Sequence, residues 1–165
     1  MSSLRVLVSR PSILVVTADP VIYSVWTGAV IRTEDATAAL ATAVAHARAQ
    51  RQCGMVVAMH PDMPLPDADI REVLQLEMRK MDPYIVGGAT VLTRDGLRGT
   101  AMRAVISTMQ LLSRPTHPEK IVSSPKEAAV FLQKTLSQKL SRSPTVEEIV
   151  SNYEEATKRA WNKAP

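Results

Sequence analysis

Hydrophobic residues in the first 26 positions of the chain form three short runs with the composition of β-strands. The runs, at residues 5–10, 13–17 and 21–26, are rich in β-branched and aromatic residues. The turn-forming pairs Pro11-Ser12 and Asp19-Pro20 separate them. Because parallel strands need a long crossover connection, three strands this close in sequence are predicted to pair antiparallel.

The hydrophobic period changes from two to about 3.6 at Thr33, and this change indicates a helix. Thr33 is predicted to be its N-cap, because Glu34 and Asp35 then occupy the first turn, where the helix dipole favours negative charge. Gly54 is predicted to end the helix, since glycine is common just past a helix end.

Continuous apolar runs of strand length follow at residues 55–59 and 84–92. Such runs are typical of strands buried on both faces of a layered sheet, and the pair Gly87-Gly88 indicates close packing or a bulge in the second run. Helical patterns alternate with these runs. They are predicted to begin near Asp67, Gly96, Ser124 and Ser143, with a short strand at residues 120–123.

This order of elements predicts an α/β fold, in which a mixed sheet has antiparallel N-terminal strands and alternating helices on right-handed crossovers. Residues 1–140 are predicted to form the α/β domain and residues 141–165 a C-terminal helical extension. The extension could pack on the domain, swap into a dimer partner or serve as a recognition arm, and the sequence leaves these arrangements open.

The composition predicts an aliphatic core, because hydrophobic residues make up 45% of the chain and aromatic residues only 4%. The eight methionines fill irregular cores or line accommodating binding surfaces, and core filling is the simpler interpretation. Cys53, the single cysteine, is predicted to be packed and unreactive, which suits a reducing compartment. No apolar run approaches the roughly 20 residues that span a bilayer, and the protein is expected to be cytoplasmic.

Charge is unevenly distributed along the chain. Residues 1–93 carry 8 Lys and Arg against 9 Asp and Glu, whereas residues 94–165 carry 12 against 7. The basic half favours an acidic partner surface or a phosphate-bearing ligand, although a solvated basic face explains it more simply. Nucleic acid is the least favoured partner, because so few aromatic residues offer no stacking platform.

Motifs of catalysis and cofactor binding are missing from the sequence. Its six glycines form neither a P-loop nor a GxGxxG pattern, and no GxSxG nucleophile elbow occurs. The turn at residues 93–96, with Gly99 one turn later, is only a weak anion-site candidate. We therefore predict a protein that is not an enzyme and holds no cofactor or metal.

Polar residues gather at the edge where the buried strands are predicted to end, which is where open α/β sheets bind ligands. A loop-bracing role for His60 is favoured over proton transfer or metal binding with Asp62, because no third ligand or nucleophile is apparent. His46 is predicted to be solvated and His117 to lie in a loop. This edge is either a solvated, salt-linked rim or a protein-recognition surface. The predicted interaction surface comprises His60, Asp62, Asp67, Asp69, Arg71, Arg94, Asp95 and Arg98.

Three stretches precede or open predicted helices: Val25-Trp-Thr-Gly28, Val56-Val-Ala-Met-His60 and Ser124-Pro-Lys-Glu-Ala128. With the predicted order of strands and helices, they give a layout that resembles the STAS or SpoIIAA-like family of anti-sigma-factor antagonists. The resemblance implies docking onto partner proteins, which the family switches by phosphorylating a Ser or Thr at the helix after the central strand. Residues 61–67, which match that region, contain no hydroxyl side chain, and aspartates would supply fixed negative charge instead. Some STAS-like relatives bind small apolar or lipid-like ligands.

A second resemblance concerns residues 140–149, which are similar to the opening of a helix in the middle region of sigma factors. A well-capped amphipathic helix is the simpler interpretation of that segment. The sequence as a whole predicts a non-catalytic bacterial regulatory module that binds a signalling protein or a second copy of itself. The alternative is a carrier or sensor that binds a small apolar ligand or a lipid.

Overall fold

The computed structural model describes residues 4–162, which form six strands, five α-helices and one short 3-10 helix. The strands are β1 (Arg5–Arg10), β2 (Ile13–Ala18), β3 (Val21–Trp26), β4 (Cys53–Met59), β5 (Ile85–Val91) and β6 (Glu119–Val122). The helices are α1 (Thr33–Gln50), α2 (Ala68–Met81), α3 (Gly96–Ser113), α4 (Pro125–Ser137) and α5 (Val146–Trp161), with the 3-10 helix at Asp82–Tyr84. Residues 1–3 and 163–165, the outer ends of the predicted domain and extension, lie outside the described residues.

All six strands belong to one sheet, in the order β1-β2-β3-β4-β5-β6. The first three strands pair antiparallel through two tight turns, whereas β3 to β6 pair parallel. Each parallel connection passes through one α-helix, followed by the 3-10 helix in the connection from β4 to β5, and the strands follow one another across the sheet in chain order. The prediction of an α/β fold with an antiparallel start and alternating helices is confirmed.

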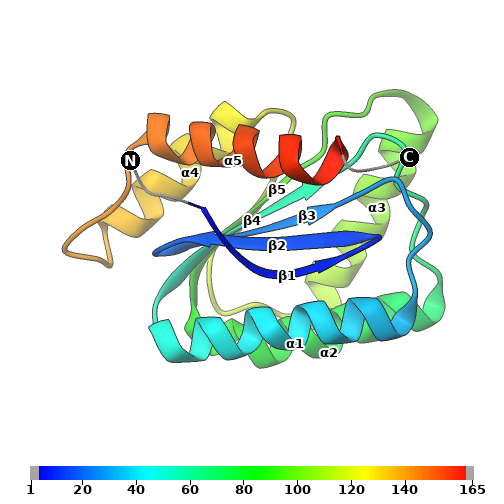
Figure 1. Cartoon of the computed structure of the whole chain (residues 1–165), viewed down its shortest axis with the longest axis horizontal. Helices are drawn as coiled ribbons and strands as arrows, with labels where there is room; N and C mark the ends of the chain where they lie inside the picture. The colour runs from blue at the N-terminus through cyan, green and yellow to red at the C-terminus, as the bar shows by residue number, and fades with distance from the viewer. Residues whose placement is uncertain (1–3, 163–165) are drawn as a thin grey trace.

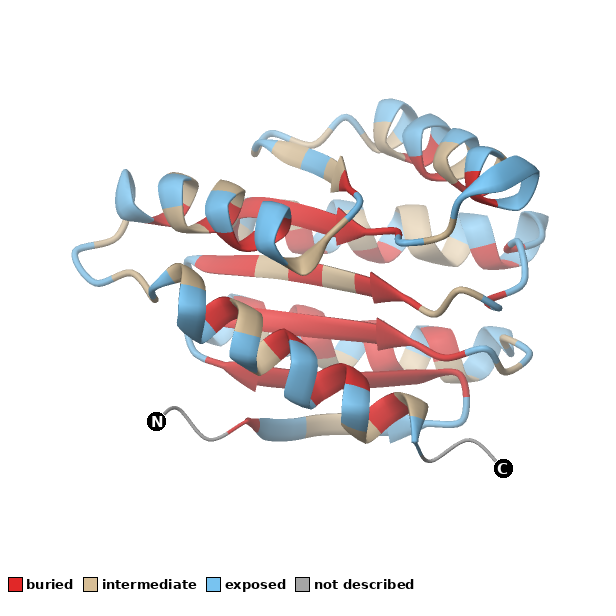
Figure 2. Ribbon diagram, turned by 90° about the horizontal axis from the view of Figure 1, so that it is seen from above, coloured by how far each residue is buried: buried red, intermediate tan, exposed pale blue. Residues whose placement is uncertain are grey.

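Helices cover both faces of the sheet. Crossovers of one hand that progress in one direction place their helices on one face, and α1, α2 and α3 lie on that face while α4 and α5 lie on the other (Figure 1). The strands between the two helical layers are buried along most of their length (Figure 2). Within residues 4–162, no helix is both long enough and apolar enough to cross a bilayer.

Helix α1 differs from its prediction at both ends. Its N-cap is Arg32, which makes no side-chain hydrogen bond, and Thr33 is the first helical residue. The helix ends at Gln50, and its C-cap is Arg51, whose φ is 69°. Gly54 therefore does not end it but lies inside β4, where a Cβ would come within 3.0 Å of the Leu132 side chain on α4. A close approach from an element so distant in sequence leaves no signal in the residues around Gly54.

The two glycines of β5, Gly87 and Gly88, point to opposite faces of the sheet. A Cβ on Gly87 would lie 2.7 Å from Cγ2 of Thr135 on α4, so this glycine is needed for close packing. A Cβ on Gly88 points to the opposite face and would meet Glu119 and His117 at 3.5–3.6 Å, an ordinary contact distance. The register with β4 also shifts next to the pair, between Cys53 and Gly54. Both predicted features, close packing and a register irregularity, are present.

Two single substitutions in this pair are expected to have opposite effects on stability. Gly87→Ala should lower the free energy of unfolding by about 1–3 kcal/mol, because the added methyl overpacks the stiff, β-branched Thr135. Gly88→Ala should leave it unchanged or raise it by about 0.4–1 kcal/mol, since the unfolded chain loses conformational freedom. Urea denaturation of both variants measures the difference, and an equal loss of stability in both would contradict this packing.

Helix α5 settles the arrangement that the sequence left open for the extension, because it packs on the sheet beside α4. Thr145 and Glu148 form the capping box that starts it. At its other end, the Trp161 Nε1–H donates to the Trp26 carbonyl at 3.1 Å. The amphipathic helix predicted after Ser143 therefore completes the apolar layer on the second face of the sheet.

Candidate functional site

A cavity of about 100 Å³ lies between the sheet and helices α2 and α3. Helix α3 is inclined to α1 and α2 and lies toward the β6 edge (Figures 1 and 2), and its backbone lies mainly against α2. Seven of the eight methionines line this methionine cavity: Met55, Met59, Met63, Met78, Met81, Met102 and Met109. The eighth, Met1, lies outside the described residues. The methionines are therefore concentrated around one space rather than spread through the core.

Strand register explains the floor of the methionine cavity. Ser24, Val57 and Thr90 are paired neighbours on β3, β4 and β5, and all three line the cavity. Met55, Gly88 and Glu119 form a second such row on β4, β5 and β6. In-register neighbours point to the same face, so the missing side chain of Gly88 leaves an open place in the floor.

A buried histidine between two carboxylates forms the polar end of the cavity. The His117 ring is 9% exposed, and its Nε2 lies 2.8 Å from Oε1 of Glu119. Its Nδ1 lies 2.7 Å from Oδ1 of Asp82, off the axis of an aligned hydrogen bond, so this contact is an ion pair. Thr116 donates to Asp82 from both its backbone N–H and its hydroxyl. The sequence placed His117 in a loop but did not predict this cluster.

These contacts set the charge of the histidine. Burial alone would lower the pKa of His117, but the hydrogen bond to Glu119 and the negative charges of Glu119 and Asp82 outweigh it and raise the pKa. Burial would raise the pKa of Asp82, yet the hydrogen bonds from Thr116 and the nearby His117 hold it below its usual range. The cluster therefore favours a protonated imidazole, which alone has a proton to donate from each ring nitrogen.

Folding stability is expected to fall as the pH rises above about 6.5, the ordinary pKa of histidine. A group whose pKa is raised in the folded state contributes its full stabilisation below the unfolded pKa and loses it as the pH rises through the folded pKa. Asp82 contributes in the opposite sense: its stabilisation is present above its unfolded pKa and is lost as the pH falls through its lower folded pKa. Urea denaturation from pH 5 to pH 9 should show that the free energy of unfolding falls above pH 6.5 in the wild type and falls less in His117→Gln. An equal fall with pH in the two proteins would contradict the raised pKa of His117.

Three buried polar atoms of the cavity lining have no hydrogen-bond partner among residues 4–162. One is Nδ1 of His117, which has only its ion pair with Asp82. The other two, Oγ of Ser24 and Oε2 of Glu119, have no polar partner of either kind; Ser24 is 1% exposed. An unsatisfied buried polar group costs roughly 1–3 kcal/mol. The Ser24 and Glu119 atoms are therefore the places where a bound molecule would gain most from a hydrogen bond.

A second cavity, of about 180 Å³, adjoins the first at the carboxyl edge of the sheet. This vestibule is lined by His60, Leu65, Arg94 and Arg98 among others, and it shares Met63 and Met102 with the methionine cavity. Two flexible thioether side chains thus separate the inner cavity from the surface. A molecule that enters from the vestibule would have to displace one of these two side chains.

Four of the eight residues predicted to form an interaction surface come together around the vestibule: His60, Asp62, Arg94 and Arg98. Nδ1 of His60 accepts a hydrogen bond from the Asp62 backbone N–H at 3.0 Å, which is the loop-bracing role that the sequence favoured. The Arg94 guanidinium donates to the Pro61 carbonyl and lies 3.5 Å from Asp62. Its charge is therefore partly neutralised by its own loop.

The other four predicted surface residues lie at helix starts rather than in the vestibule. Asp67 caps α2 by accepting from the Ile70 backbone N–H at 2.9 Å, and Asp69 and Arg71 follow in the first turns. Asp95 is the N-cap of α3 without a side-chain bond. The charged edge is therefore divided between a vestibule and two helix ends.

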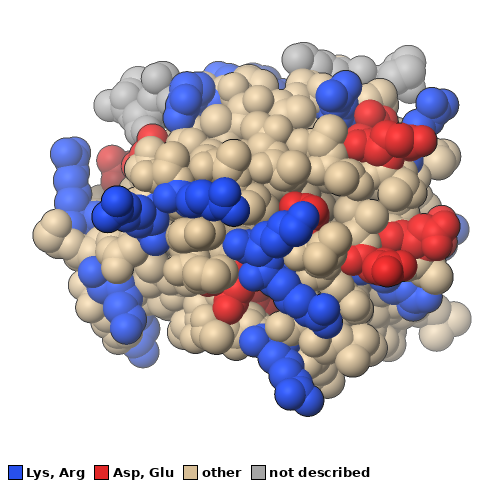
Figure 3. Space-filling model, turned by 90° about the horizontal axis from the view of Figure 1, so that it is seen from below, with Lys and Arg blue, Asp and Glu red and all other residues tan. Residues whose placement is uncertain are grey.

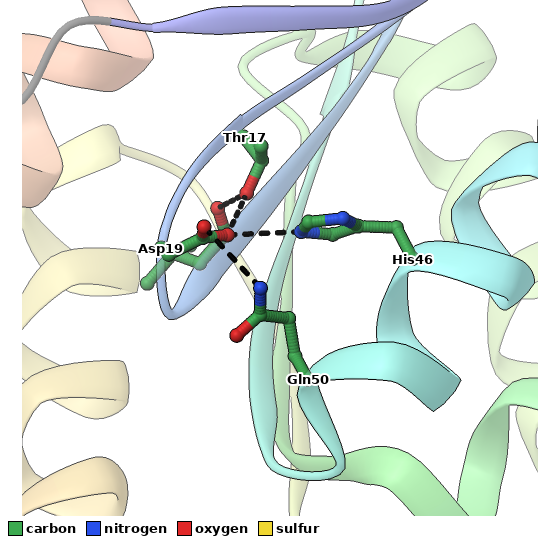
Figure 4. A network of polar contacts seen from close by, with 5 residues as sticks. Thr17, Asp19, His46 and Gln50 are labelled. Atoms are coloured by element: carbon green, nitrogen blue, oxygen red, sulfur yellow. Dashed lines mark hydrogen bonds and ion pairs between the residues drawn. The ribbon is translucent and has the colours of Figure 1, made fainter.

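Another polar network lies at the opposite end of the sheet, in the turn between β2 and β3 (Figure 4). Asp19 accepts from the Thr17 hydroxyl at 2.7 Å and from Gln50 at 3.4 Å, and its Oδ1 lies 2.9 Å from Nε2 of His46. Burial opposes ionisation of Asp19, but these partners lower its pKa below the usual value. The prediction of a solvated His46 is wrong, because its side chain is only 10% exposed and ties α1 to this turn. The network braces the fold, since Thr17 bonds to Asp19 and not to the imidazole that would have to activate it.

Cys53 is buried in the layer beneath α1, as predicted. Burial, with a smaller effect from the charge of Asp19, raises the pKa of its thiol to about 12. A thiol with that pKa is almost entirely protonated at neutral pH, so it is a poor nucleophile and metal ligand. In the described part of the chain, no group of three or more His, Cys, Asp or Glu side chains is arranged to hold a metal ion.

No family model matches the sequence, and comparisons with curated proteins and with solved structures give no match either. The resemblance to the STAS family therefore stays a prediction.

Proposed function

We propose that the chain binds a small, mostly apolar molecule in the methionine cavity, as the carrier or sensor that the sequence suggested as its alternative function. The observation that carries this proposal is the gathering of seven methionines around one space whose lining also contains three buried polar atoms without a hydrogen bond. Methionine has three rotatable bonds and a polarizable sulfur, so such a lining adapts to different shapes. Buried polar atoms are rarely left without a partner in native cores, and three around one cavity are explained by a molecule that binds there.

The volume of the cavity limits the size of the molecule. An engineered apolar cavity of about 150 Å³ stays dry and binds benzene, and the methionine cavity, at about 100 Å³, is somewhat smaller. Rotation of Met63 or Met102 would join it to the vestibule of about 180 Å³. A ligand of about five to eight heavy atoms is therefore expected, with movement of one or two thioether side chains on binding.

Titration with benzene tests binding in this cavity without reference to any polar group. Protein labelled with ¹³C in the methionine methyl groups reports on seven lining residues at once, with Met1 as the remaining signal. Saturable shifts of the lining methyl signals in the wild type, lost in Gly88→Val, would support the proposal. The side chain added by Gly88→Val fills the open place in the floor, so this variant is the matched control. Unchanged methyl signals at saturating benzene would refute the proposal.

Docking of a protein partner, the leading prediction from the sequence, is a second candidate function. The exposed leucines of α3 support it. Leu97 is 91% exposed, Leu111 77% and Leu112 55%, so one helix shows bare apolar side chains at both ends. The helix contains Arg98 and Arg103 and no acidic residue. Lys and Arg are spread over the helical face, while Asp and Glu gather toward one end of it (Figure 3). An amphipathic partner helix with acidic residues beside its apolar stripe fits this surface.

A photo-crosslinking residue at position 97 or 111 tests docking in cells, with position 154 on the opposite face as the control. Docking would be supported if positions 97 and 111 both crosslink to the same protein and the crosslinked residues lie in an acidic amphipathic segment of that protein. Crosslinks between two copies of the chain, or equal yields at all three positions, would count against it.

A further inference from the structure

We infer that the ligand carries a hydrogen-bond donor, an amine or a hydroxyl group, and that this group binds the Glu119 carboxylate at the inner end of the methionine cavity. The inference rests on the proposed function and names the chemistry of its ligand. It also fixes the orientation: the polar group lies deep, and the hydrocarbon part extends along the floor of the cavity.

The charges around the cavity favour a donor over an anion. Among the described residues, no Lys or Arg side chain lines it. Its polar end consists of two carboxyl groups and one imidazole, so the formal charge with all three ionised is −1. Nε2 of His117 is occupied by Glu119, and an anion at Nδ1 would meet the Asp82 carboxylate, which lies 2.7 Å from that nitrogen. A carboxylate ligand would bring a third negative charge into this dry space without a counter-charge.

The place of Glu119 on the sheet favours its carboxylate as the group that binds the ligand's donor. Its Oε1 is held by His117, while its Oε2 is buried and unpartnered among residues 4–162. The side chain lies over Gly88, the one floor position without a side chain. Oε1 would lie 3.6 Å from a Cβ on Gly88, so a donor placed above Gly88 is beside the carboxylate whose other oxygen, Oε2, has no partner among the described residues. Hydrogen bonds to charged groups are stronger than those between neutral groups.

Ser24 lies too far away to share the same head group. It belongs to β3, whereas Glu119 belongs to β6. Three strand spacings of about 4.8 Å and an offset of two residues along the strands separate them by roughly 16 Å. Val57, Gly88 and Thr90 lie in the two rows of the floor that join them. This arrangement suits an aliphatic chain that starts from a donor at Glu119, runs across the strands and ends short of Ser24.

The reverse orientation would place an anionic head group in the vestibule, and the structure favours this orientation less. Arg94 and Arg98 could bind an anionic head if the ligand entered tail first. Arg94, however, already has the Pro61 carbonyl and Asp62 as partners, and Arg98 is exposed to solvent. An exposed arginine pairs weakly with a ligand anion, whereas the buried oxygen of Glu119 has no competing partner among the described residues.

Three ligands of matched length test the inference: pentylamine, pentanol and pentanoate, titrated into the full chain by isothermal calorimetry and methionine-methyl NMR. Pentylamine should bind at least tenfold more tightly than pentanoate, with pentanol between them. Glu119→Gln should remove most of this preference, and Glu154→Gln, an exposed carboxylate on α5, should keep it. The wild-type ranking alone decides the matter if Glu119→Gln does not fold.

Equal or tighter binding of pentanoate would overturn the inference, and loss of pentanoate binding in Arg98→Gln would then place the head in the vestibule. Benzene separates this failure from that of the proposed function. If benzene binds and the amine shows no preference, only the head-group assignment fails. If neither benzene nor any of the three ligands binds, the cavity is not a ligand site.

Discussion

Replacing Tyr153 with alanine is expected to lower the free energy of unfolding by about 3–5 kcal/mol, the range for removing a large aromatic side chain from a core. Tyr153 is 5% exposed and lies on the buried stripe of α5, in the same apolar layer as Leu132 of α4 and Tyr23 of β3. The truncation would leave a cavity in that layer and uncover part of the sheet. Urea denaturation measures the change.

Glu154→Ala, at the adjacent exposed position on α5, is the control and should change stability by less than about 0.5 kcal/mol. The comparison separates a docked helix from a free arm. If Tyr153→Ala were as mild as Glu154→Ala, α5 would not be packed on the sheet in solution.

Met102→Ala is expected to have the second largest effect, a loss of about 2–5 kcal/mol. Met102 is 5% exposed and separates the methionine cavity from the vestibule, so its truncation joins the two spaces. The enlarged cavity should then accept benzene readily. Benzene at 100 times its Kd would restore about 2.7 kcal/mol of the lost stability, which thermal denaturation with and without benzene measures.

Leu112→Ala on the same helix is the matched control for Met102→Ala. Leu112 is more than half exposed, and its truncation should cost less than about 0.5 kcal/mol. The helical spacing of Met102, Met109 and Leu112 predicts that they share one buried stripe. In the structure Leu112 is instead exposed, at the C-terminal end of α3. An equal cost for the two variants would show that α3 packs in a different register.

Local signals in the sequence were sufficient to predict the architecture. The short spacing between the first three strands allowed only antiparallel pairing, and apolar runs such as 55–59 identified the strands buried on both faces. Asp67 and Ser124, near which helices were predicted to begin, cap α2 and α4 through hydrogen bonds from backbone N–H groups three residues on. The last helix, predicted to begin near Ser143, is capped two residues later by Thr145. The residues that form each cap lie within a few positions of one another, so residue type and spacing indicate the helix starts to within about two residues.

The features that the sequence did not reveal all depend on contacts between distant segments. His46 appeared solvated because its partner, Asp19, lies in a turn of another element. The cluster around His117 joins the end of α2 to the start of β6. Gly54 resembled a helix terminator because its real partner, Leu132, belongs to α4. Periodicity describes one element at a time and carries no information on such pairs.

The methionine cavity left one signal in the sequence, but that signal did not show where the methionines lie. Eight methionines in a chain with 4% aromatic residues suggested either core filling or an adaptable surface, and Gly88 suggested close packing. Only the sheet register shows that Met55, Gly88 and Glu119 are neighbours. Of the eight residues predicted to form one interaction surface, four, His60, Asp62, Arg94 and Arg98, lie together around the vestibule, and their role in binding stays a prediction.

Xenon is the most direct probe of the central claim, because it enters only preformed or easily opened apolar cavities. A crystal of the full chain pressurised with xenon should show an anomalous peak beside Gly88, enclosed by methionines of β4, α2 and α3. The same experiment on Gly88→Val should show no peak there. A wild-type crystal in which the methionine side chains fill this space, with no xenon bound between the sheet and α3, would contradict the account.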